Sequence, residues 1–126
     1  MLNNFYEGSD GNIYIRDLEE VNFNNCIIYG SLTTEISFQQ EESGLFNYNF
    51  NHCLLKIDPS IDTDNNYYQS VILNQSPAFS AKLEDDFNLK ANSPAVNTGS
   101  IATDGTLDII GNIRLNADMG AYEYIE

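Results

Sequence analysis

The chain has little positive charge. Five Lys and Arg stand against 19 Asp and Glu among its 126 residues, which gives a net charge of −14. A surface with this charge repels nucleic-acid phosphates and anionic membranes, so we expect no nucleic-acid partner. No apolar run approaches the roughly 20 residues of a membrane-spanning helix, so we expect no membrane insertion.

Cysteine and histidine are also scarce. The two cysteines, Cys26 and Cys53, are too few for a disulfide framework and lack the spacing of metal-binding pairs. The only histidine, His52, precedes Cys53, but neighbouring residues of a strand face opposite sides, which argues against a Cys–His nucleophile. Gly-rich phosphate loops are missing, and we expect no catalytic residues in this chain. The N-terminus lacks the basic start and apolar run of a signal peptide.

Asparagine and aromatic residues are abundant instead. The chain has 17 Asn, which favours tight turns, and eight Tyr and seven Phe, which favour strands. Long helical periodicity is missing. Together these features predict an all-β protein built from short strands.

One short phrase occurs twice, 27 residues apart. Residues 23–28 read FNNCII, and residues 50–55 read FNHCLL. Repeats at such a period indicate one structural unit stacked on a copy of itself. Side-chain alternation changes parity at Asn25 and at His52, which predicts a corner between two short strands, with both residues at the positive φ that Asn and His tolerate.

Stacking of the two phrases predicts a right-handed, single-stranded parallel β-helix, a solenoid. Its interior would contain a ladder of like residues on adjacent parallel strands, with the two thiols reduced and buried. The ladder consists of Phe23 on Phe50, Cys26 on Cys53 and Ile28 on Leu55. We expect the β-helix coils over residues 1–90 and an irregular C-terminal cap of the same domain over residues 91–126.

The last third of the chain carries a recognisable pattern. It comprises residues 86–99, DFNLKANSPAVNTG, and the spaced set Asp104, Asp108, Gly111, Arg114, Asp118 and Gly120-Ala121-Tyr122-Glu123. This pattern resembles the terminal segment of bacterial right-handed parallel β-helix proteins of the choice-of-anchor Q and polymorphic-outer-membrane types, whose fold is pectate-lyase-like. The resemblance implies the C-terminal part of a longer, exported surface protein, and therefore an extracellular or cell-surface location. Asn97 stands where that family commonly has Asp.

Three groups of side chains are candidate sites. Arg114 with Asp108, Asp118 and Glu123 predicts a structural cap, since a guanidinium group matches carboxylates. The alternate oxygen ligands of Asp62, Asp64 and Asn66 suggest a calcium loop, although a solvated turn is the simpler interpretation and no other cofactor is indicated. An exposed row of tyrosines would stack on sugar rings. Its members are Tyr14, Tyr29, Tyr48, Tyr67 and Tyr68.

These observations favour a non-catalytic role, structural, adhesive or glycan-binding, within an exported bacterial surface protein. Its partners would be cell-surface, dietary or host glycans. The alternative is the C-terminal part of a polysaccharide lyase or glycosidase whose active site lies on preceding coils. Leu2, Phe5 and Ile13 would leave the first coil open, so we also expect self-association there, or continuation with N-terminal coils.

Overall fold

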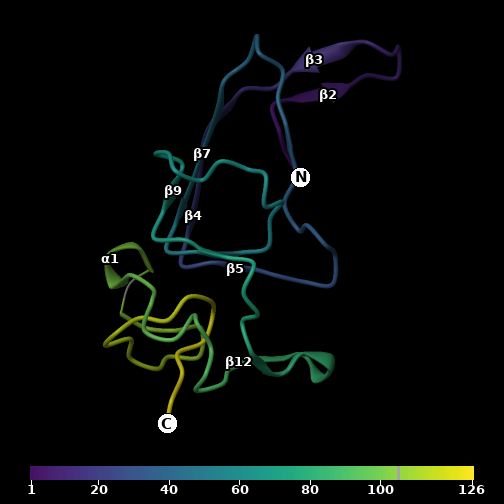
Figure 1. The fold of residues 1–126 in the computed structure, drawn as a ribbon. Helices are drawn as coiled ribbons and strands as arrows, with labels where there is room; N and C mark the ends of the chain where they lie inside the picture. Colours follow the sequence, from purple (N-terminus) through teal and green to yellow (C-terminus); the bar gives the residue numbers. More distant parts are fainter. Residues whose placement is uncertain (105) are drawn as a thin grey trace.

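The structure is a computed structural model that describes residues 1–104 and 106–126 (Figure 1). Short strands dominate among these residues, which also include one 3-10 turn and one four-residue helix. In chain order the elements are β1 (Leu2–Asn3), β2 (Phe5–Glu7), β3 (Ile13–Ile15), β4 (Leu18–Asn24), β5 (Ile27–Ile28), β6 (Phe38–Gln39), β7 (Phe46–Asn51), β8 (Leu54–Leu55), β9 (Tyr68–Gln69), β10 (Ile72–Leu73), β11 (Phe79–Ala81), η1 (Lys82–Glu84), β12 (Asp86–Leu89) and α1 (Ile101–Asp104).

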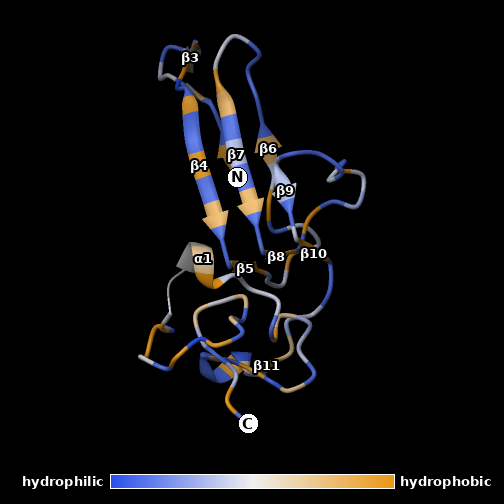
Figure 2. Cartoon of the chain, turned by 90° about the vertical axis from the view of Figure 1, so that its left-hand side faces the viewer, coloured by the Kyte–Doolittle hydropathy of each residue, from blue (hydrophilic) through white to orange (hydrophobic). Residues whose placement is uncertain are grey.

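The repeated phrase forms two small parallel sheets. One has the strand order β4-β7-β9 and the other β10-β8-β5. Phe23 is in register with Phe50, and Ile28 with Leu55, so the parallel pairing predicted for the two phrases is confirmed. Two further strands, β9 and β10, each extend one of these sheets. They place Tyr68 beside Phe50 and Leu73 beside Leu55. Figure 2 shows β4 and β7 side by side, with hydrophobic and hydrophilic residues alternating along β4.

A corner with a left-handed backbone separates the two sheets. Asn25 and His52 have φ of 50° and 52°, as the change of parity predicted. Ser70 lies at the equivalent corner, between β9 and β10, and has φ of 52°. Residues in this conformation turn the chain sharply, because a strand otherwise keeps alternate side chains on one face. The aromatic and aliphatic halves of each phrase therefore both contribute to one core.

The predicted right-handed β-helix with a C-terminal cap is wrong. The described strands form five separate sheets of two or three strands, and these are not coiled into a solenoid. Two of the sheets are antiparallel hairpins, β2–β3 and β11–β12. The turn at Gly8 to Asn12, closed by a 2.8 Å bond from the Gly8 N–H to the Asn12 carbonyl, folds β3 back on β2. Ile13 is therefore exposed on the hairpin, which projects from one end of the molecule (Figure 1).

Two hydrophobic clusters lie on opposite faces of β8. Leu55 belongs to the first cluster, with Phe50 and Cys53, and Leu54 belongs to the second. Both leucines are fully buried, so this strand is covered on both sides. In the second cluster Leu54 packs against Leu89, Ala95 and Met119, which come from the C-terminal part of the chain.

The C-terminal segment thus covers a face of the β10-β8-β5 sheet. Asn25 attaches it further, because the Asn25 side chain donates to the Ser100 carbonyl and accepts from the Ser100 N–H, both at 2.7 Å. A cap would instead lie across the end of stacked strands. The division of the chain at residue 90 stays a prediction.

Candidate functional site

An aromatic cleft forms beside β7. Its lining residues are Phe38, Gln40, Phe46, Tyr48, Ile61 and Tyr67, and its volume is about 340 Å³. We call it the aromatic cleft below. The lining comes from β6, β7 and the loop before β9, and the parallel pairing of β7 with β9 brings Tyr48 and Tyr67 close together.

Tyr48 is the centre of this cleft. Its ring stacks on Phe38, with centroids 5.0 Å apart, and on Tyr67, with centroids 4.8 Å apart, while Phe46 meets it edge-on at 5.5 Å. Stacked and edge-on geometries are those that aromatic rings prefer. Tyr67 keeps 43% of its surface exposed, so the group presents an aromatic surface to solvent.

Of the five tyrosines predicted for glycan stacking, the structure brings only Tyr48, Tyr67 and Tyr68 together. Tyr68 is buried and is not among the residues that line the cleft, and its hydroxyl lies 3.3 Å from that of Tyr48. Burial, followed by this hydrogen bond, raises the pKa of Tyr68 above its usual value. Tyr14 instead stacks on Tyr6 in the β2–β3 hairpin, and Tyr29 lies under the Lys56 ammonium group.

Sequence reasoning missed four members of the cleft, namely Phe38, Gln40, Phe46 and Ile61. The alternation Phe46-x-Tyr48-x-Phe50 was a usable signal, because residues two apart on a strand share a face. Nothing in the sequence indicated that β6 and the loop at Ile61 come to the same place.

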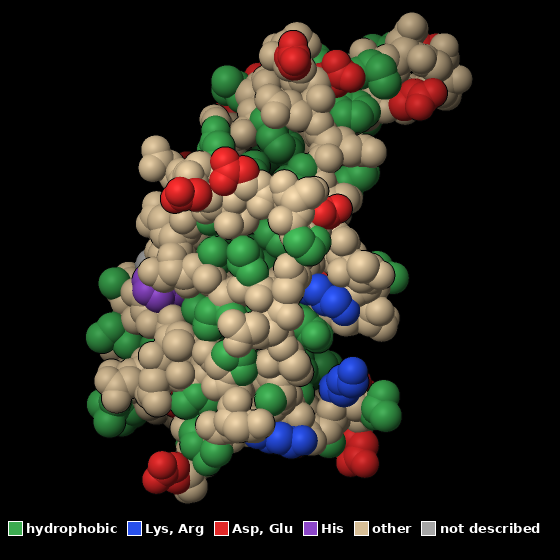
Figure 3. Space-filling view, in the orientation of Figure 1, with side chains coloured by type: hydrophobic (Ala, Val, Ile, Leu, Met, Phe, Trp, Pro, Cys, Tyr) green, Lys and Arg blue, Asp and Glu red, His purple; other side chains and the backbone are tan. Residues whose placement is uncertain are grey.

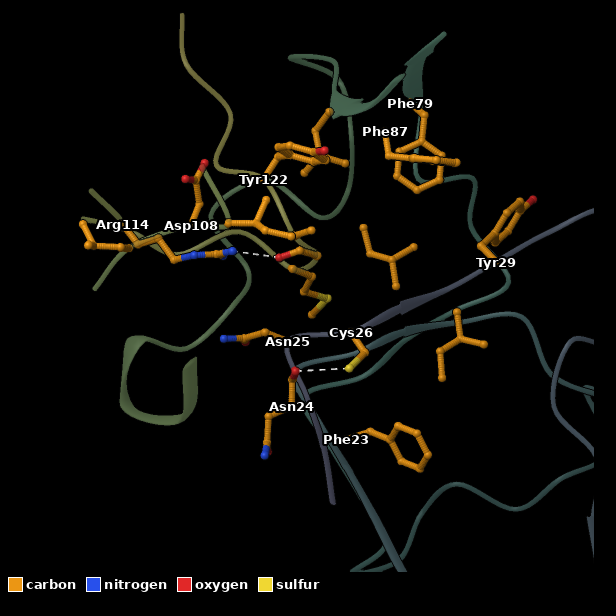
Figure 4. A pocket seen from close by; sticks show the side chains of 18 residues that line it. Phe23, Asn24, Asn25, Cys26, Tyr29, Phe79, Phe87, Asp108, Arg114 and Tyr122 are labelled. Carbon is orange, nitrogen blue, oxygen red and sulfur yellow. Dashed lines mark hydrogen bonds between the residues drawn. The ribbon is translucent and has the colours of Figure 1, made fainter. Parts of the chain in front are cut away.

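A second, larger hollow runs along β5, and we call it the edge groove. Its volume is about 870 Å³, and its lining includes every residue from Phe23 to Tyr29. The opposite wall comes from the C-terminal half of the chain, including Phe79, Phe87 and Tyr122, as the close view shows (Figure 4). Most of the surface is apolar, although Asp108 and Arg114 also line the groove.

The two thiols lie next to each other in the first cluster and are in the reduced form. The Cys53 thiol donates to the Phe23 carbonyl at 3.3 Å. A hydrogen bond with Cys26, followed by burial, raises the pKa of Cys53, which opposes the thiolate form that a nucleophile needs. His52 turns away and lies with its Nδ1 2.8 Å from the Asn51 side-chain oxygen.

Arg114 organises the C-terminal segment. Its two terminal nitrogens donate to the carbonyls of Asp118 and Gly120, both at 2.8 Å, and it lies 3.7 Å from the Glu123 carboxylate. The side chain is only 3% exposed. The structure thus brings Arg114 and Glu123 together, and Arg114 also binds two backbone carbonyls.

Asp108, also in this group, accepts backbone bonds of its own. Burial raises the pKa of Asp108. Hydrogen bonds from the N–H groups of Glu123, Asn112 and Ile110 and from the Asn112 side chain lower it by more, so the resulting pKa is about 2. Asp118 likewise accepts from the N–H groups of Asn97 and Tyr124. Both carboxylates therefore accept hydrogen bonds from main-chain N–H groups and hold the turns of the C-terminal segment.

The loop of Asp62, Asp64 and Asn66 is a local turn. The Asp64 N–H donates to the Asp62 carboxylate at 2.9 Å, and the Asn66 carbonyl accepts from the Asn49 side chain at 3.1 Å. Within residues 1–104 and 106–126, no three His, Cys, Asp or Glu side chains form a group that could hold a metal ion.

Comparison of the chain with protein-family models, with curated proteins and with solved structures finds no match. The resemblance of the C-terminal segment therefore stays a prediction. Among the residues that the structure describes, no helix has the length and hydropathy needed to cross a membrane.

Proposed function

We propose that this chain is a non-catalytic adhesive module that binds glycans through the aromatic cleft. The observation that carries the proposal is the stack of Phe38, Tyr48 and Tyr67, which leaves the Tyr67 ring partly open to solvent. Sugar rings have apolar C–H faces that pack on aromatic rings, and a ring already held by its neighbours loses little freedom on binding.

The cleft also has the size and polarity that suit a small sugar unit. Its volume of about 340 Å³ falls within the roughly 300–1,000 Å³ of small-ligand sites. Gln40 is exposed at its rim, and an amide both donates and accepts hydrogen bonds, as sugar hydroxyls require.

The charge of the chain selects among glycans. Acidic side chains are distributed over the face seen in Figure 3, from the β2–β3 hairpin to the C-terminal end, and the net charge is −14. Acidic polysaccharides are repelled by such a surface, so we expect neutral glycans as ligands. The exported surface location rests on the resemblance of the C-terminal segment.

A glycan array of neutral oligosaccharides, followed by calorimetric titration of the best ligand, tests this proposal. Tyr67→Ala removes the exposed ring and is expected to weaken binding at least tenfold, about 1.4 kcal/mol. Tyr67→Phe keeps the ring and should retain most of the affinity.

Tyr14→Ala is the matched control. Tyr14 is 42% exposed against 43% for Tyr67, and it also stacks on another tyrosine, yet it lies outside the cleft. Equal losses for the two alanine variants, or no binding of any neutral glycan, would refute the proposal. Release of shorter sugars during long incubation would show an enzyme instead of a binding module.

A further inference from the structure

At one edge of the two parallel sheets, the apolar residues of the repeat are only partly covered. Phe50, Cys53 and Leu55 are fully buried, but the equivalent residues one strand outward, Phe23, Cys26 and Ile28, are only partly buried. The reason is strand order, because β4 and β5 are the outermost strands of their sheets. Phe50 has the Phe23 ring on one side, at 4.7 Å, and the Tyr68 ring on the other, at 5.6 Å.

Backbone groups repeat in the same way. The Leu54 N–H donates to the Cys26 carbonyl at 2.9 Å, and the Ile72 N–H donates to the Cys53 carbonyl at 2.8 Å. By register, the corresponding donor on β5 is the Ile27 N–H, which faces outward. An outer strand presents such groups as a template for another strand.

The edge groove follows this template. Seven consecutive residues, 23–29, line it, so its length runs along the chain (Figure 4). The partly buried Phe23, Cys26 and Ile28 side chains are among the residues that line it. A hollow of this form fits an extended polypeptide better than a compact ligand.

The charge of the β4 edge indicates which kind of polypeptide would bind there. Glu19 and Glu20 are exposed at the beginning of β4, beside Asp17. A second copy of this chain would bring its own acidic strands and net charge of −14 against them, which is unfavourable. A strand with basic residues at its N-terminal end is complementary.

We propose that the β4 and β5 edge takes up a segment of a partner protein, which adds as two short parallel strands, one on β4 and one on β5, joined by a corner level with Asn25. The segment carries an aromatic residue level with Phe23, a small apolar residue level with Cys26 and an aliphatic residue level with Ile28. Its N-terminal end carries basic side chains opposite Glu19 and Glu20. Main-chain hydrogen bonds supply affinity. The match of apolar side chains to Phe23, Cys26 and Ile28, together with the opposite charges, supplies specificity.

A labelled synthetic peptide tests the proposal on the unmodified protein. Residues 17–29 of the chain already have the required apolar pattern. With the substitutions D17K, E19K, E20K and C26A, the peptide should bind with a Kd below about 1 mM. The peptide with only C26A keeps its acidic residues and should bind at least tenfold more weakly, with a smaller difference in about 0.5 M salt.

N-methylated peptides test the strand geometry. In the existing pairs, the Asn25 N–H donates to the Asn51 carbonyl and the Phe50 N–H to the Tyr67 carbonyl. The peptide amides at positions 23 and 25 should therefore face β4, so methylating them should weaken binding at least tenfold. Methylation at positions 22 and 24, which face away, should change Kd less than threefold.

Two further measurements complete the test. The protein variant with Glu19→Lys and Glu20→Lys, whose fold is checked by circular dichroism, should prefer the acidic peptide. No binding of the basic peptide at about 1 mM, equal effects of the two methylation patterns, or an unchanged charge preference would each overturn the proposal. So would a dimer in sedimentation that the basic peptide does not dissociate, because a second copy would then occupy the edge.

Discussion

Replacing Phe50 by alanine is expected to remove a large part of the stability of this protein. The Phe50 side chain is fully buried between the rings of Phe23 and Tyr68, and Tyr48 meets it edge-on at 5.8 Å. Removing a buried Phe ring typically costs about 3–5 kcal/mol, and lost ring contacts contribute at the upper end of that range. We therefore expect a loss of about 4 kcal/mol, against a total of about 5–15 kcal/mol for a domain.

Phe23→Ala is the matched control, because Phe23 has the same residue type and the same position in the repeat. It is only partly buried and stacks on one ring of the parallel sheet, that of Phe50. The expected loss is about 2 kcal/mol, half of the Phe50 value, because less apolar surface and fewer ring contacts are lost.

Urea unfolding followed by circular dichroism measures both effects. With a slope of about 2 kcal/mol per molar urea, the midpoint should fall by about 2 M for Phe50→Ala and about 1 M for Phe23→Ala. Should Phe50→Ala fail to fold, Phe50→Leu, which retains most of the volume, should lose roughly 1.5 kcal/mol. Equal losses for the two alanine variants would refute the reasoning, since it depends on Phe50 being enclosed and Phe23 being at an edge.

Two further predictions concern the C-terminal segment. Arg114→Ala should lower stability by about 3 kcal/mol in thermal melts without changing glycan affinity, because the Asp118 and Gly120 carbonyls lose a buried charged donor; an unchanged melting temperature would contradict this. The pKa of Asp108 is lowered from 3.8 to about 2, so its stabilisation is present above pH 4 and is lost as the pH falls toward 2. Asp108→Asn should therefore be less stable than the wild type at pH 6 and nearly equal to it at pH 2, as urea titrations at the two pH values would measure.

The local part of the fold was readable from the sequence. The two phrases that begin at Phe23 and Phe50 predicted a parallel register, and the change of parity predicted the corner at Asn25 and His52. Both inferences depend only on the two-residue period of a strand, which is a local property. The third phrase, beginning at Tyr68, was missed because it follows after 18 residues instead of 27 and has Val71 where the others have Cys.

The candidate sites were less predictable. Tyr48 and Tyr67 were named from their residue type, but the other residues of the aromatic cleft come from β6, β7 and the loop before β9, whose relative positions depend on packing. Arg114 and Glu123 were predicted to meet and do so, whereas Asp108 accepts backbone amides that no motif indicated. Side chains whose partners are main-chain groups leave little trace in a sequence.

By itself, the sequence determined strand character, the parallel pairing of its two phrases and the acidic surface, because these follow from side-chain periodicity and composition. Only the tertiary structure decided that the chain folds into five separate small sheets and that the C-terminal segment covers the outer face of β8. The adjacent leucines Leu54 and Leu55 show the physical reason. Each needs burial, but which distant segment buries Leu54 depends on contacts 35 to 65 residues away in the chain, with Leu89, Ala95 and Met119.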